Sequence, residues 1–216
     1  EWIASVERGQ RILECCCQHI VIAGFSTGGA VALQCVIRQP DAFEAIISIS
    51  APLRFKSFSA NFAEPVNISN RFISTLGLKW PQKSFVTNHA DNPHINYLRC
   101  PISSIVQIKH LMRRVKKDLA TINIPSLIMH ADHDPKVDVR GGRELYRLIG
   151  SSIKYYQEVC FHQHGIVRGE IAQQVFKKSG DFLALVRGRT DLIAQPISPV
   201  QDGSTAIMPA PVRIWA

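Results

Sequence analysis

The sequence predicts an α/β fold in which a mainly parallel sheet carries helices on both faces, and three observations support this prediction. Short apolar runs alternate with segments of helical periodicity along most of the chain. The helical segments are long enough to cross over from one parallel strand to the next. The chain has 216 residues and is 46% hydrophobic, which suffices for one sizeable core.

The chain opens with a predicted helix, a strand and a second helix. Residues 2–17 place apolar side chains among charged ones, the pattern of an amphipathic helix. Residues 19–23 are nearly all apolar and are bounded by Gly24, as expected for a strand buried on both faces. Residues 28–38 are rich in Ala, Leu and Val and end before Pro40, so we expect a helix there.

The same alternation continues to the end of the predicted core. Three further strands are expected at residues 45–50, 125–130 and 153–159, and three further helices at residues 103–119, 140–148 and 170–186. Strands and helices in this order predict parallel βαβ units. Catalytic side chains in such sheets lie at the carboxyl ends of the strands.

A long insertion separates the second and third predicted strands. Residues 52–101 are rich in aromatic side chains but only weakly periodic, and a structureless loop of this length is uncommon in a compact domain. We therefore expect a small helical cap or lid over the strand ends. Residues 1–51 and 102–189 would form the core, and residues 190–216, rich in Pro, Gly, Ser and Ala, a flexible tail or linker.

Composition and charge argue against several classes of protein. The formal net charge is +8, but the basic residues are scattered except for one cluster that we interpret as the solvated face of a helix: Lys109, Arg113, Arg114, Lys116 and Lys117. No aromatic interleaving or nucleic-acid motif accompanies the cluster, so we expect no nucleic-acid partner. No apolar run approaches the roughly 20 residues that cross a bilayer.

The cysteines and the first residues bear on the compartment. Cys15, Cys16 and Cys17 are consecutive, the other three are isolated, and no metal-binding spacing occurs, so reduced thiols are the simpler interpretation. The chain begins at Glu1 without a basic or an apolar leader region. We therefore expect a cytoplasmic protein without an integral membrane segment.

The first candidate for catalysis is a Gly-x-Ser-x-Gly motif at residues 24–28, between a predicted strand and a predicted helix. A sharp turn there would expose the hydroxyl of Ser26, while the glycines permit close backbone packing. The helix N-terminus would direct its amides at developing negative charge, and the N–H of Thr27 would donate to an oxyanion. By itself the motif is also compatible with a glycine-rich turn and a capping serine.

Two more polar residues follow predicted strands. Asp134 comes shortly after the third strand and His164 shortly after the fourth, which gives the order Ser, Asp, His. His164 would take the proton of Ser26, and Asp134 would orient the imidazole. Asp132 and Asp138 are rival acids, and single residues of these types are more often turn, capping or surface residues.

A metal site is a weaker alternative for the same stretch. Imidazole and carboxylate groups are competent ligands, but adjacent positions after a strand point in different directions, which argues against a shared ion: His130, Asp132, His133 and Asp134. We expect neither a metal nor another cofactor.

Residues 24–29, residues 130–137 and residues 164–167 resemble three motifs of carboxylesterases and monoacylglycerol lipases in the α/β-hydrolase superfamily. The last two correspond to the family's H-G-x-x-D-x-x-V and H-x-I/V patterns. The resemblance implies that Ser26 is the nucleophile, Asp134 the acid and His164 the base, whereas His162 has no counterpart. We also expect a substrate pocket lined by Phe25, Trp80 and Val137.

The chain departs from the family pattern in two places. Ala131 replaces the usual glycine before the acid loop, a small change. The family also places several strands and an oxyanion loop before the helix with which this sequence begins. We therefore expect an N-terminally truncated form of the fold, with the second oxyanion donor outside this sequence.

These features predict a hydrolase of carboxylic esters that acts on small molecules with an apolar acyl or alcohol group. A thioesterase or another acyl hydrolase remains open, because the same triad cleaves several acyl bonds and the pocket decides among them. A binding module that keeps the fold without turnover is the third possibility. The sequence leaves the oligomeric state open.

Overall fold

The computed structural model describes residues 1–56, 62–77, 83–87 and 97–188. Four parallel strands form its central sheet in the order β1-β2-β5-β6. They are β1 (Val21–Phe25), β2 (Ala45–Ile49), β5 (Ser126–Ala131) and β6 (Lys154–Val159). The parallel sheet and its alternation with helices agree with the predicted fold class. The expected tail at residues 190–216 lies outside the described residues.

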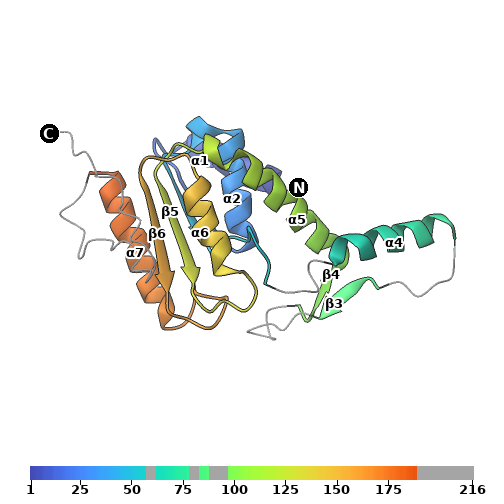
Figure 1. Cartoon of the computed structure of the whole chain (residues 1–216). Helices are drawn as coiled ribbons and strands as arrows, with labels where there is room; N and C mark the ends of the chain where they lie inside the picture. Colours follow the sequence, from blue (N-terminus) through green and yellow to red (C-terminus); the bar gives the residue numbers. More distant parts are fainter. Residues whose placement is uncertain (57–61, 78–82, 88–96, 189–216) are drawn as a thin grey trace.

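Helices cover both faces of this sheet, as Figure 1 shows. On one face, α2 (Thr27–Arg38) and α6 (Val139–Leu148) pack on the strands together with the C-terminal half of α5 (Ile102–Asp118). The other face is covered by α7 (Ile171–Val186). The strands β2 and β5 are buried along their whole length, because they lie in the middle of the sheet and helices cover both sides.

The first helix, α1 (Trp2–Glu14), packs on α2 through Ile3 and Val6. It is three residues shorter than predicted, since the chain turns at Cys15. The strand β1 begins and ends two residues later than predicted and runs through Gly24. We expected Gly24 to end the strand, but its lack of a side chain lets the start of α2 lie directly against it.

The insertion contains a helix and a small antiparallel ribbon. The helix is α4 (Ala63–Thr75), and the ribbon pairs β3 (Phe85–Thr87) with β4 (Arg99–Pro101). The predicted helical cap is therefore mixed in structure. Figure 1 also shows α4 set to one side of the sheet, at the N-terminal end of α5, and not over the strand ends as we expected.

The position of the insertion follows from its contacts with α5. Ile102, Ile105 and Val106, in the first turns of α5, form a small apolar cluster with Ala63 of α4. Further along the same helix, Leu111 and Val115 belong to the main core. The helix α5 thus joins the two clusters, and a division of core from cap at residues 52–101 remains a proposal.

Two short 3-10 turns complete the described elements, at Pro40–Ala42 and Leu119–Thr121. No helix in the described part of the chain is both long and apolar enough to cross a membrane. All six cysteines are free thiols.

Candidate active site

Ser26 sits on the sharp turn between β1 and α2, with φ 54° and ψ −125°. A non-glycine residue rarely adopts a positive φ, so the surrounding contacts must hold this conformation. The N–H of Ser26 donates to the carbonyl of Ile49 at 2.8 Å, which ties the turn to the end of β2. A Cβ on Gly24 would lie 2.2 Å from the carbonyl oxygen of Gly28, so only glycine fits at that position.

The helix α2 begins directly after this turn. The carbonyl of Ser26 accepts hydrogen bonds from the N–H groups of Gly29 and Ala30, at 2.9 and 3.3 Å. The first N–H groups of a helix have no acceptor within it, and α2 starts at Thr27. The positive end of the helix and its free amides therefore lie next to the hydroxyl of Ser26.

Asp134 lies in the loop between β5 and α6, residues 132–138, which we call the acid loop. Asp134 is 1% exposed. Its Oδ1 accepts hydrogen bonds from the backbone N–H groups of Lys136 and Val137, at 2.7 and 3.0 Å. Burial alone would raise the pKa of this carboxyl group. The hydrogen bond and positive charge of His164, together with the two backbone donors, outweigh burial and hold the pKa of Asp134 below its usual value. Asp134 is therefore an ionised acceptor at neutral pH.

His164 lies in the loop between β6 and α7 and connects the other two residues. Its Nδ1 is 2.6 Å from Oδ2 of Asp134, and its Nε2 is 2.7 Å from Oγ of Ser26. His164 is only 7% exposed, and its ring packs against the ring of Phe25, with the centroids 5.0 Å apart. The sheet thus brings together three side chains that are 138 and 30 residues apart in sequence.

The rival residues have other partners. Asp132 accepts a hydrogen bond from the N–H of Phe161 at 2.9 Å. Asp138 caps α6 by accepting from the N–H of Arg140 at 3.0 Å and also binds the guanidinium of Arg140. His162 packs beside Phe161. Among the candidate carboxylates, Asp134 is the one that contacts His164.

The expected pocket residues differ in their positions. The ring of Phe25 lies beside His164, whereas Trp80 lies outside the described residues. The side chain of Val137 is 2% exposed, and its backbone N–H supports Asp134. Val137 thus supports the loop that carries Asp134, and a substrate pocket lined by Phe25, Trp80 and Val137 stays a prediction.

Sequence reasoning missed a strap that holds the acid loop. The backbone N–H of Lys56 donates to the carbonyl of Lys136 at 3.1 Å, and the N–H of Asp138 donates to the carbonyl of Arg54 at 3.0 Å. The ammonium group of Lys56 also donates to the carbonyl of Asp134 at 3.3 Å. The partners in these hydrogen bonds lie about 80 residues apart in sequence, so no local pattern predicts the contacts.

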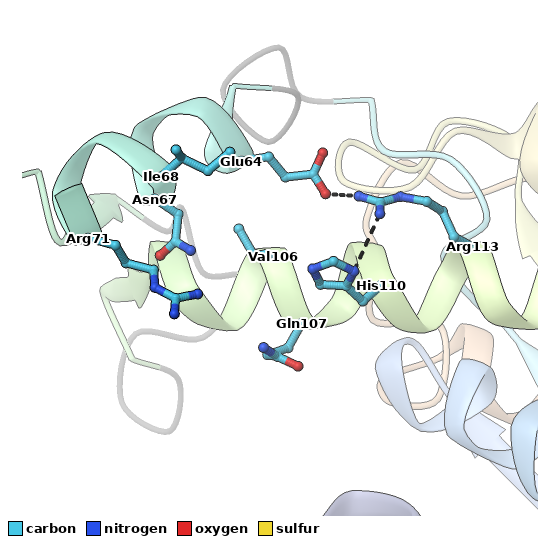
Figure 2. Close-up of a pocket in the computed structure, with 8 residues that line it drawn as sticks. All are labelled: Glu64, Asn67, Ile68, Arg71, Val106, Gln107, His110 and Arg113. Atoms are coloured by element: carbon cyan, nitrogen blue, oxygen red, sulfur yellow. Dashed lines mark hydrogen bonds and ion pairs between the residues drawn. The ribbon is translucent and has the colours of Figure 1, made fainter.

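A cavity of about 440 Å³ lies between α4 and α5 and is shown in Figure 2. At one end Glu64 forms ion pairs with Lys109 and Arg113, two members of the predicted basic cluster. None of the three candidate catalytic residues lines this cavity. The ion pairs instead connect the insertion to α5, so part of the basic cluster serves a contact between helices.

Known proteins resemble this chain in sequence and in fold. The family model Hydrolase_4, described as serine aminopeptidase S33, matches residues 10–168. A thermostable monoacylglycerol lipase from Bacillus sp. (strain H-257) is 29% identical over 186 residues, which cover 85% of this chain and 70% of that protein.

Two solved structures share the fold. One comes from work on LipS and LipT, two metagenome-derived lipolytic enzymes; its TM-score is 0.71 at 20% identity, and the match covers 87% of this chain and 72% of that one. The other is a monoacylglycerol lipase from Paleococcus ferrophilus, with a TM-score of 0.65 at 16% identity, covering 88% of this chain and 74% of that one.

Proposed function

We propose, from the premise that the chain belongs to the serine aminopeptidase S33 family of α/β hydrolases, that it hydrolyses carboxylic esters through an acyl-enzyme on Ser26. The observation that carries the proposal is the position of His164, which lies within hydrogen-bond distance of both Ser26 and Asp134. The relative from Bacillus, a monoacylglycerol lipase, supports an ester of a fatty acid as substrate.

In the first half of the reaction, Oγ of Ser26 attacks the ester carbonyl while Nε2 of His164 takes the hydroxyl proton. Asp134 holds Nδ1 of the ring and stabilises the imidazolium that forms. The N–H of Thr27 donates to the oxyanion of the tetrahedral intermediate. When this intermediate collapses, His164 returns the proton to the departing alcohol and the acyl group stays on Ser26.

In the second half, water replaces the alcohol. His164 takes a proton from the water as it attacks the acyl-enzyme, and it then returns that proton to Oγ of Ser26 as the carboxylic acid leaves. The low pKa of Asp134 suits both steps, because the carboxylate stays ionised while the imidazole gains and loses its proton. No cofactor takes part in this scheme.

A panel of p-nitrophenyl esters from acetate to laurate tests the proposal with the purified protein. We expect hydrolysis of at least one ester and loss of nearly all activity in Ser26→Ala and His164→Gln. Asp134→Asn should lower kcat by about 10⁴-fold, since a correctly held tautomer is lost.

Matched substitutions supply the controls for His164 and Asp134, because a histidine and an aspartate outside the proposed triad lie two positions before them. His162→Gln and Asp132→Asn should keep most of the wild-type rate. A folded wild-type protein that hydrolyses none of the esters would contradict the proposal. Equal losses in Asp132→Asn and Asp134→Asn would contradict the assigned acid.

A further inference from the structure

His130 is a buried residue of β5, the strand that leads into the loop of Asp134. It is the fifth residue of β5, four positions before Asp134, and its side chain is fully buried. It pairs with Glu158 on β6. The N–H of Ser50 donates to the carbonyl of Met129, which puts Ser50 beside His130 at the end of β2. His130 therefore belongs to a polar row one register before the carboxyl end of β5, where Ala131 pairs with Val159.

Several polar atoms of this row have no hydrogen-bond partner among the described residues. Within the described residues, neither nitrogen of His130 has a hydrogen-bond partner, and the same holds for the hydroxyl of Ser50. Buried polar atoms are usually paired, and an apolar side chain would fill such a place without that cost. We therefore look to the shape and position of the imidazole for the reason that this residue occupies the place.

The ring lies flat against α6 at a place where the helix has no side chain. A Cβ on Gly142 would lie 2.4 Å from Cδ2 of His130 and 2.8 Å from its Cγ and Nε2. Gly142 is the fourth residue of α6, and the loop that carries Asp134 joins β5 to this helix. The contact between His130 and Gly142 thus lies between the two elements that the loop joins.

We propose that His130 is a positioning residue for the acid of the proposed triad: its thin ring sets the spacing of β5 and α6, and through the loop the place of Asp134 against His164. This inference rests on the proposed function. The flat imidazole ring fits the space beside Gly142, where a branched side chain would push α6 away.

The surroundings of the His130 ring favour its neutral form. Burial is the largest influence and lowers the pKa of His130 to about 4, with opposing effects from Asp134 and Glu158 and a further lowering by His164. Glu158 is itself paired with Arg143 of α6. A neutral ring adds no second positive charge when His164 takes its proton, so its presence is compatible with the proposed reaction.

Substitutions on both sides of the contact test the proposal. His130→Leu and Gly142→Ala should each lower kcat for the best p-nitrophenyl ester by about tenfold or more, because small misplacements of a catalytic group are costly. KM should change little, since neither residue meets substrate. The low-field proton resonance of a hydrogen bond between His164 and Asp134 should shift or broaden in both variants.

A double variant makes the test specific to the contact. The single variant His130→Ala is measured as well. In His130→Ala/Gly142→Ala the space left by the ring accepts the new methyl group, so kcat should exceed the value that multiplying the effects of His130→Ala and Gly142→Ala gives. Gln34→Leu is the control. It too removes a buried polar atom that has no hydrogen-bond partner among the described residues, but on α2 and away from the loop, so it should leave kcat unchanged.

The outcomes separate this inference from the proposed function. Wild-type protein that does not react with a fluorophosphonate probe overturns both. Wild-type protein that reacts, beside folded His130→Leu and Gly142→Ala variants with wild-type kcat and an unmoved low-field proton, overturns the role of His130 alone. One further result overturns the role of His130. In it, kcat falls only as far as the fraction of folded protein measured by urea titration, and Gln34→Leu shows an equal fall.

Discussion

At the scale of single residues, Asp134 and His130 affect stability in different ranges of pH. Asp134 is buried with its pKa lowered, so its ionised form contributes stability above about pH 4, and this contribution is lost as the pH falls through the lowered value. His130 is buried as a neutral base, so it acts in a different window. The two effects can therefore be measured separately.

The burial of His130 leads to a prediction for the pH dependence of stability, which can be tested without measuring activity. Its pKa is about 4 in the folded protein and 6.5 in the unfolded chain. Between these values the unfolded chain binds a proton that the folded protein does not, so stability falls as the pH falls. The full effect at pH 4 is about 3 kcal/mol, since one pKa unit corresponds to about 1.4 kcal/mol.

Urea unfolding of the wild type and of His130→Leu at pH 7, 5.5 and 4.5 measures this effect. The wild type should lose unfolding free energy steadily from pH 6.5 downward, and the variant should show a much flatter dependence. His162→Gln, which changes a more exposed imidazole, should follow the wild type. The same slope in His130→Leu as in the wild type would show that the folded protein binds a proton at His130 as easily as the unfolded chain does.

At the scale of elements, the unit formed by β1, the turn and α2 determines where Ser26 lies. Its local pattern is strong, because a buried apolar run, two glycines and an alanine-rich helix follow one another directly. The sequence therefore predicted the turn and the place of Ser26. The two-residue shift of β1 shows the limit of such reasoning, because close packing on Gly24 decides where the strand ends.

The tight packing of this unit predicts a large effect of one methyl group. Gly24→Ala would place Cβ 2.2 Å from the carbonyl oxygen of Gly28, a backbone atom that cannot move alone. We expect a loss of about 3 kcal/mol or more in unfolding free energy. Gly9→Ala in α1 meets nothing within 4 Å and should instead stabilise the protein by about 0.5–1 kcal/mol.

Chemical denaturation of the two variants and the wild type distinguishes these effects. A Gly24→Ala variant as stable as the wild type would show that the turn opens easily, and the account of Ser26 as a tightly held residue would then be wrong.

The ribbon in the insertion shows why other elements escape prediction. Each of its strands has three residues, and the structure pairs Phe85 with Pro101, sixteen residues further along the chain. Such short strands show no alternation, so their pairing depends on partners that the local sequence does not reveal. The strap of residues 54–56 on the acid loop escaped prediction for the same reason.

At the scale of the whole molecule, the parallel order of the strands gathers Ser26, Asp134 and His164 at one edge of the sheet. The order of the motifs along the chain was sufficient to predict this gathering, because parallel strands end at the same edge. What the sequence could not predict was the surroundings of the three residues. The contact of Phe25 with His164 and the burial of Val137 depend on side chains brought together by the complete fold.

The proposed reaction requires that Ser26 becomes acylated with the help of His164 and Asp134. Mass spectrometry of the protein after reaction with a fluorophosphonate, followed by peptide mapping, shows whether Ser26 is the residue that reacts. We predict one adduct per chain on Ser26 at neutral pH, no adduct in Ser26→Ala and a much slower reaction in His164→Gln. An adduct on another residue, or undiminished labelling of Ser26→Ala, would contradict the claim.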